Sequence, residues 1–206
     1  DRARQIRRVS KLLREQLREP LTSMFSKPLR DGFELRLVEE RHAEEMFAVV
    51  DRERQHLRAW LPWVDATRSP DDSLAFIRAS LEQFANNKGF AAGIWKGPLF
   101  AGTVGTHPID WMNRKVELGY WLAREFEGRG IVTEACRVVT AHLLNELDLH
   151  RVEIRCAVPN VKSAAVPRRL GFTHEATLRE ANCVNGGYYD LMVFAMLQQD
   201  WKQRPA

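Results

Sequence analysis

The sequence predicts an α+β protein built around one mixed sheet whose strands are mostly antiparallel. Three observations support this prediction: seven apolar segments typical of strands, helical periodicity in the segments between them, and short turns that join three successive strands. Strands joined by such turns are expected to pair antiparallel. The expected strands are 33–38, 89–95, 99–109, 115–123, 150–158, 172–181 and 188–197.

Composition indicates an ordinary globular chain. Its 206 residues are 45% hydrophobic and 28% charged, and no stretch approaches the roughly 20 apolar residues that span a bilayer. The charged first twenty residues do not resemble a signal peptide. Three widely spaced cysteines and six histidines without an HxxxH pair indicate neither a disulfide framework nor a metal site. We therefore expect a cytoplasmic protein that binds no metal.

The first twenty residues differ from the rest in charge. They hold seven Arg or Lys and three Asp or Glu, whereas the remainder has 24 residues of each sign. The sequence predicts a basic amphipathic helical extension over 1–20, ended by Pro20, ahead of a domain over 21–206. We expect the extension to pack on its own domain or on a second subunit of a homodimer, rather than on RNA or a membrane. No DNA partner is indicated. The apolar face of the extension comprises Ile6, Val9, Leu13 and Leu17.

The helices between the strands have clear sequence signals. Ser69 is typical of a helix cap, and Pro70 with the acids after it suits a first turn. Gly171 is expected to end the last helix in the left-handed conformation. Before Ser69, Trp60 and Trp63 bracket a proline; they either pack in the core or line a substrate cleft. The expected helices are 39–61, with Ala43, Met46, Phe47 and Val50 on one face, 69–87, 130–149 and 160–172.

A glycine turn joins the strand 115–123 to the next helix, in the stretch "EFEGRGIVTEACR". The first amides of that helix lack intrahelical partners and lie at the positive end of its dipole, which suits a phosphate group. Gly128 and Gly130 would let the backbone approach a ligand closely, and Arg129 adds a cation. The spacing matches neither GxGxxG nor a Walker loop, so a simple tight turn is the alternative.

Several segments together resemble one family. They are "HLRAWLPWVD", "GTHPIDWMNRKVELGYWL", the glycine turn, "RVEIRCAVPNVKSAAVPRRLGF" and "YYDLMVFAML". In combination they resemble the GNAT superfamily of acetyl-CoA-dependent N-acetyltransferases, and more closely its RimJ/RimL-type branch of ribosomal-protein-serine and -alanine acetyltransferases. The resemblance covers roughly residues 21–201. It implies a GNAT-type sheet splayed at one strand, with helices on both faces.

The resemblance also implies where acetyl-CoA binds. The pantetheine arm would lie in the splay beside Tyr120, Trp121 and Leu122, and opposite Asn160 and Ser163. The pyrophosphate would rest on the glycine turn, which comprises Gly128, Arg129, Gly130, Ile131, Val132 and Thr133.

Three positions depart from the family pattern. Glu127 and Val132 occupy places where the family usually has Gln or Arg and Gly or Ala, and a carboxylate beside a pyrophosphate is unfavourable unless it turns away. Pro167 stands where many members carry a catalytic tyrosine, which excludes a tyrosine acid there.

The implied reaction moves an acetyl group from a thioester to an amine. It requires a group that accepts a proton from the amine, and a partner for the departing thiolate, but no covalent enzyme intermediate. Ser163 is the candidate thiolate partner. The candidate bases are Glu117, on the strand where many members carry theirs, His107 on the neighbouring strand, and Glu180, although the acid of RimL-type proteins corresponds to Asn182 here.

The resemblance leaves the acceptor open. A protein N-terminal α-amine, in the manner of the ribosomal-protein enzymes, is expected. The alternatives are a small-molecule amine, such as an amino-acid conjugate or an antibiotic, and a module that binds acyl-CoA without chemistry. Fold alone does not decide among them.

Overall fold

A computed structural model describes residues 26–203, and these residues form one eight-stranded sheet in the order β1-β2-β3-β4-β5-β6-β8-β7. Every neighbouring pair is antiparallel except β5 and β6, so the predicted mixed, mostly antiparallel sheet is confirmed. The strands are β1 (Ser26–Pro28), β2 (Phe33–Leu37), β3 (Ala91–Lys96), β4 (Leu99–Thr106), β5 (Lys115–Leu122), β6 (Arg151–Ala157), β7 (Thr173–Val184) and β8 (Gly187–Leu197).

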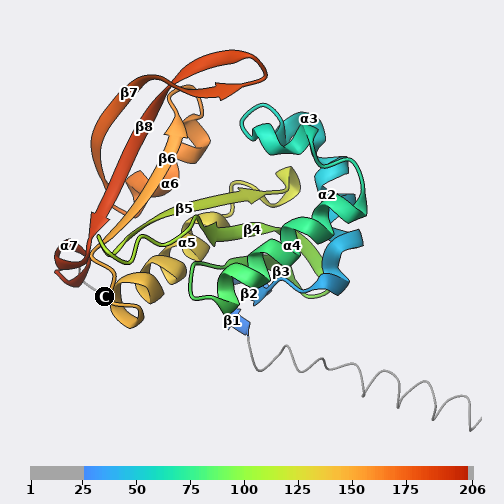
Figure 1. Cartoon of the computed structure of the whole chain (residues 1–206), viewed down its shortest axis with the longest axis horizontal. Helices are drawn as coiled ribbons and strands as arrows, with labels where there is room; N and C mark the ends of the chain where they lie inside the picture. The colour runs from blue at the N-terminus through green and yellow to red at the C-terminus, as the bar shows by residue number, and fades with distance from the viewer. Residues whose placement is uncertain (1–25, 204–206) are drawn as a thin grey trace, which may run out of the picture.

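Helices cover both faces of the sheet (Figure 1). The helices α2 and α4 pack together on one face, and α5 packs against β4 and β5 on the other. The α-helices are α2 (Ala43–Arg52), α3 (Arg54–Leu57), α4 (Pro70–Ala85), α5 (Ile131–Ala141), α6 (Val161–Arg169) and α7 (Gln198–Lys202). The expected helix over 1–20, and a dimer contact through it, lie outside the described residues.

The sheet divides into two arms between β5 and β6. These strands pair over three residues only, from Lys115–Arg151 to Glu117–Glu153. Beyond that point β5 stays paired with β4 as far as Leu122, and β6 stays paired with β8. Figure 1 shows the two strands diverging from their shared start near α7. The splay that the family resemblance implied is therefore present.

One hydrophobic core fixes both arms and the start of α5. Leu118 on β5, Ile154 on β6 and Phe194 on β8 are all 1% exposed or less. Ile131, at the first turn of α5, is equally buried. Because apolar burial stabilises by about 25 cal/mol per Å², the core anchors the helix end that follows the glycine turn.

Two helix ends follow the sequence signals. Ser69 caps α4 in a reciprocal capping box with Asp72, and Pro70 is the first helical residue. Gly171 follows α6 with φ 61°, the left-handed conformation that its sequence position predicted.

The prediction of a single helix over 39–61 is wrong. The chain leaves helical geometry at Glu53 (φ −92°, ψ 6°), between α2 and the short α3. The guanidinium of Arg54 donates to the carbonyls of Val64 and Thr67, at 2.5 and 2.7 Å, and so draws the following loop back toward α2. The helix over 130–149 also differs, because α5 continues past Ala141 as a π-helical turn. The short strand β1 was not expected.

We predict that Gly102→Ala destabilises the fold where β4 pairs with the far end of β5, at Leu122. A Cβ at Gly102 would meet the Trp121 carbonyl oxygen and lie 2.9 Å from the Leu122 Cα, and these backbone atoms cannot move without disturbing the sheet. We expect the free energy of unfolding to fall by about 2–3 kcal/mol in urea titrations. Gly119→Ala is the matched control, because the nearest atom to its Cβ lies 3.8 Å away. Equal losses in the two variants would contradict the prediction.

Candidate active site

A cavity of about 1120 Å³ opens where the two arms part. Its walls come from the diverging halves of β5 and β6, the start of α5, the start of α6 and the loop between α3 and α4. Ligand sites are commonly 300–1,000 Å³, so this cavity has room for a long ligand and a second reactant.

The glycine turn forms one end of the cavity. Gly128 and Gly130 have φ of 77° and 74°, and a Cβ at Gly128 would have no atom within 4 Å. The first hydrogen bond of α5 runs from the Glu134 amide to the Gly130 carbonyl at 3.0 Å. The amides of the residues between them therefore precede the helical ladder and face outward at the positive helix end, which fits a phosphate group. Those residues, Ile131, Val132 and Thr133, all line the cavity.

The two charged residues of the turn do not lie as the sequence suggests. Arg129 donates to the Glu125 carbonyl at 3.4 Å and does not line the cavity. Glu127 lies between His56 Nε2, at 2.9 Å, and Lys162 Nζ, at 2.5 Å. Burial alone would raise the pKa of Glu127, but the hydrogen bond from Lys162 and the nearby His56 outweigh it and lower the pKa. The carboxylate therefore stays ionised and paired.

Another part of the cavity wall is formed by β5 and α6. Within the described residues, the edge of β5 toward β6 has no strand partner beyond Glu117. The Tyr120 hydroxyl crosses the gap to Ser163, where it donates to the carbonyl oxygen at 2.9 Å and lies 3.1 Å from Oγ. The Asn160 side chain accepts from the Ser163 amide at 3.2 Å. Trp121 and Leu122 also line the cavity, with Trp121 on the face of β5 opposite to Tyr120, so all five predicted residues lie around one cavity.

Two further groups lie close to Ser163. Burial raises the pKa of the Cys156 thiol, and a hydrogen bond with Ser163 partly offsets this effect. Pro167, where many family members have a tyrosine, is buried within α6. The hydroxyl that contacts Ser163 therefore comes from β5, through Tyr120.

Two of the three candidate bases lie at the edge of the cavity, on the neighbouring ends of β4 and β5. His107 Nε2 is 3.8 Å from Glu117 Oε1, and Arg155 Nε is 3.4 Å from Glu117 Oε2. Arg155 is itself held by Glu153, which is 7% exposed and also pairs with Arg151. Burial alone would raise the pKa of Glu153, but the two guanidinium groups lower it. A fixed row of alternating charges therefore ends at Glu117.

Glu180 lies away from these groups. It is exposed on β7 at an irregularity of the strand, with φ 49°, and its amide donates to the Asp190 carboxylate at 2.9 Å. Glu180 does not line the cavity, whereas Asn182 does. A catalytic role for Glu180 gains no support from this placement and stays a prediction.

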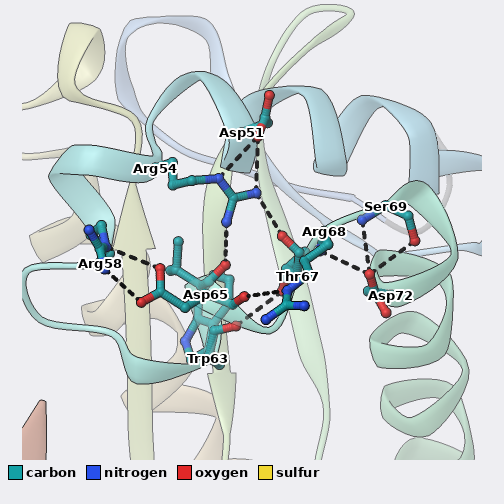
Figure 2. A network of polar contacts seen from close by, with 10 residues as sticks. Asp51, Arg54, Arg58, Trp63, Asp65, Thr67, Arg68, Ser69 and Asp72 are labelled. Atoms are coloured by element: carbon teal, nitrogen blue, oxygen red, sulfur yellow. Dashed lines mark hydrogen bonds and ion pairs between the residues drawn. The ribbon is translucent and has the colours of Figure 1, made fainter. Parts of the chain in front are cut away.

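The tryptophan loop forms the opposite wall, which favours the cleft interpretation for both tryptophans. Trp60 and Trp63 line the cavity, and Trp63 is 39% exposed, with its ring centroid 6.1 Å from that of Trp121. Figure 2 shows how the loop is braced: two hydrogen bonds join Arg58 to Asp65, at 3.0 and 2.9 Å. The wall is thereby held in place beside α4.

The hairpin of β7 and β8 reaches over the same region (Figure 1). At its turn the Asn185 side-chain amide donates to the Arg58 carbonyl at 2.8 Å, just after α3. The two arms of the sheet therefore touch again at the rim of the gap.

Sequence analysis did not single out His56, Lys162 or Arg155 as site residues. Arg151, Glu153 and Arg155 alternate along one strand, which is a signal for a charged face, but such a pattern usually marks a solvated surface. Nothing in the sequence pairs His56 or Lys162 with Glu127.

Comparison with known proteins identifies the family and the fold. The profile of the acetyltransferase (GNAT) domain matches residues 33–173. The chain belongs to the GNAT acetyltransferase family. It is accordingly an acetyl-CoA-dependent N-acetyltransferase, as the sequence resemblance implied.

Two curated relatives of this GNAT protein carry ribosomal names. The Bacillus subtilis protein named "Putative ribosomal N-acetyltransferase YdaF" is 37% identical over 180 residues, which cover 87% of this chain and 98% of the relative. The Escherichia coli ribosomal-protein-serine acetyltransferase is 27% identical over 81% of this chain and 93% of the relative.

Solved structures confirm the fold and the cosubstrate. RimL, the ribosomal L7/L12 α-N-protein acetyltransferase, in complex with coenzyme A has a TM-score of 0.81 at 26% identity, over 85% of this chain and 99% of that one. The microcin C7 self-immunity acetyltransferase MccE, in complex with acetyl-CoA and AMP, has a TM-score of 0.77 at 30% identity, over 82% and 93%.

Residues 26–203 provide neither a cluster of metal ligands nor a membrane-spanning helix. No group of three or more His, Cys, Asp or Glu residues in this range could hold a metal ion. No helix in the same range has the length and apolar character that crossing a membrane requires.

We predict that the buried Tyr120 hydroxyl contributes to a fall in the free energy of unfolding in alkaline solution. Burial raises its pKa well above 10.0, with a smaller contribution from Cys136, against the hydrogen bond with Ser163 that lowers it. Because the unfolded chain loses this proton first, the stabilisation is complete below pH 10 and is lost as the pH rises above it. Urea titrations from pH 8 to 11 should show a steeper loss for the wild type than for Tyr120→Phe. Parallel curves would contradict the prediction.

Proposed function

We propose that this GNAT enzyme acetylates a protein N-terminal α-amine, and that its acceptor is a ribosomal protein. The similarity to YdaF and to the ribosomal-protein-serine acetyltransferase supports this acceptor class. RimL, whose structure is similar over almost its whole length, is named for action on such an α-amine.

The observation that carries the proposal is the two-sided character of β5. Successive residues of a strand point to opposite faces, so Tyr120 reaches Ser163 while Trp121 lies beside Trp63. Glu117 shares the Trp121 face and contributes a carboxylate. A carboxylate on this face suits an ammonium group through charge attraction. An amine could therefore approach from this face while the cofactor residues line the other.

The cofactor side follows from the same division. We propose that the turn from Gly128 to Thr133 binds the pyrophosphate, and that the free edge of β5, Asn160 and Ser163 hold the pantetheine arm. Acetyl-CoA supplies the activated acetyl thioester.

The chain's own residues then have separate tasks. An α-amine has a pKa near 8 and reacts only after it loses a proton. Glu117 accepts that proton, and the exposed His107 beside it offers a route to solvent. As the new C–N bond forms and the C–S bond breaks, the nitrogen loses a second proton, which neutralises the departing thiolate. Ser163 donates a hydrogen bond to the departing sulfur, with its hydroxyl oriented by Tyr120. Transfer is direct, without a covalent enzyme intermediate.

A small-molecule amine is the second candidate acceptor. The MccE structure, which contains AMP beside acetyl-CoA, is 30% identical to this chain and covers most of it. The aromatic loop with Trp60 and Trp63 would also suit a planar ring.

The acceptor is tested by following free thiol release from acetyl-CoA in the presence of candidate amines. We expect turnover with peptides that begin with the N-terminal sequences of ribosomal proteins, and none with the same peptides formylated at the α-amine. Mass spectrometry should find the acetyl group on the α-amine and on no lysine. Turnover with aminoacyl-nucleotide conjugates alone would replace the peptide proposal with the small-molecule one, and coenzyme A binding without release from any amine would favour the binding module.

We predict that Glu117→Gln lowers kcat about 100-fold, the lower range for loss of a general base, while calorimetric affinity for coenzyme A is kept. Ser163→Ala should lower kcat about tenfold, because the departing sulfur loses its hydrogen-bond donor. The start of α6 should be unaffected, because the Asn160 cap accepts from the Ser163 backbone amide. The matched control is Glu146→Gln, which also removes a carboxylate paired with a histidine, at 2.8 Å, but outside the cavity. A Glu117→Gln variant with wild-type kcat and pH profile would exclude Glu117 as the base.

A further inference from the structure

Three polar side chains meet at the cofactor end of the cavity. Glu127 Oε1 is 2.9 Å from His56 Nε2, and Glu127 Oε2 is 2.5 Å from Lys162 Nζ. We call His56, Glu127 and Lys162 the clasp. All three line the cavity.

The clasp joins the two arms of the sheet. His56 lies on α3 and Glu127 precedes the glycine turn, both on the β5 side of the gap. Lys162 lies in the first turn of α6, which packs with β6, β7 and β8. The pair of Glu127 and Lys162 therefore spans the gap between the turn and the opposite wall.

A carboxylate beside a phosphate-binding turn needs compensation. Two like charges about 4 Å apart repel by about 4 kcal/mol at an effective dielectric constant of 20. In the clasp each carboxylate oxygen has its own cationic or hydrogen-bonding partner, so the negative charge of Glu127 is offset.

Exposure distinguishes the two partners of Glu127. The Lys162 side chain is 72% exposed, on a flexible four-carbon stem, whereas His56 is 18% exposed and Glu127 25%. Lys162 is therefore free to change partner, while His56 and Glu127 are held by their surroundings.

We propose that Lys162 is a phosphate-binding residue that Glu127 holds in reserve. In the free protein Lys162 pairs with Glu127 across the gap; when coenzyme A binds, Lys162 turns to a cofactor phosphate. His56 keeps the Glu127 carboxylate and holds it clear of the turn. This inference rests on the proposed binding of the pyrophosphate at Gly128–Thr133.

The clasp implies that Glu127 lowers the affinity for coenzyme A, which can be measured. Glu127 competes with the cofactor for Lys162, so the natural residue weakens the binding of coenzyme A. When Lys162 leaves Glu127 for a cofactor phosphate, the ion pair that links the two arms would also break.

The test is isothermal titration calorimetry of each purified variant with coenzyme A. We expect Glu127→Gln to lower Kd about three- to tenfold and Lys162→Gln to raise Kd by a similar factor. Glu127→Gln should improve the affinity for coenzyme A less in the Lys162→Gln background than in the wild type. In that background Glu127 no longer competes with the cofactor for Lys162. Independent, additive effects would overturn the exchange of partners.

The His56 variant tests the holding role. His56→Ala should raise Kd, because the freed carboxylate can approach the turn, and Glu127→Gln in the same chain should restore wild-type affinity or better. A loss that Glu127→Gln does not restore would mean that His56 acts by packing alone, and would overturn this part of the proposal.

Matched controls separate charge from shape. Arg78 and Glu40 form an exposed ion pair at 2.9 Å outside the cavity, so Glu40→Gln should leave Kd unchanged. Pantetheine, which lacks phosphates, should compete with coenzyme A equally well in wild type and in Lys162→Gln. An equal loss for pantetheine would overturn the phosphate contact.

A further pair of variants tests the turn separately from the clasp. Gly128→Ala puts a methyl group at the turn, whereas Gly97→Ala adds a similar backbone strain, at φ 58°, in the β3–β4 turn away from the cavity. If Gly128→Ala weakens the binding of coenzyme A and Gly97→Ala does not, the turn binds the cofactor. The clasp variants then decide the clasp proposal on its own. If neither weakens it, the turn assignment fails and the clasp proposal fails with it.

Discussion

The short parallel pairing between β5 and β6 is the constraint on which the site depends. Backbone amides and carbonyls need partners when they are buried, and these strands supply them to each other over three residues only. Past Glu117 and Glu153 the strands part, so one edge of β5 lies open inside the molecule. The core beneath this point is continuous, with Leu118 and Ile154 almost fully buried. The gap is therefore built into the sheet and does not arise from loose packing.

Charged side chains cross this gap where backbone hydrogen bonds do not. Arg155 on β6 reaches Glu117 on β5, and Lys162 on α6 reaches Glu127 at the glycine turn. In both pairs the carboxylate belongs to one arm and the cation to the other. Partly exposed ion pairs contribute about 0–1 kcal/mol each, so these bridges define the width of the gap without locking it. A ligand can replace them at small energetic cost.

The sequence predicted the frame of the molecule better than its charge pairs. Strand alternation, the Ser69 cap and the Gly171 end are local signals, and the structure confirms each of them. The family resemblance further indicated the neighbourhood of Tyr120 and Ser163, which do meet.

Long-range partners could not be found in the same way. Glu127 meets His56 across 71 residues and Lys162 across 35, and only the folded sheet brings them together. The expected long helix over 39–61 failed for a related reason. Its periodicity is continuous, but the hydrogen bonds of Arg54 to the loop that follows favour a break that no local signal announces.

The contact between Asn185 and the Arg58 carbonyl has a mechanical consequence. The two arms are joined at the base by a ladder of three residue pairs, part-way along by Tyr120 and Ser163, and at the rim by this hydrogen bond. The tip of the hairpin can therefore leave α3 only when this hydrogen bond breaks, and a typical hydrogen bond contributes about 0.5–1.5 kcal/mol.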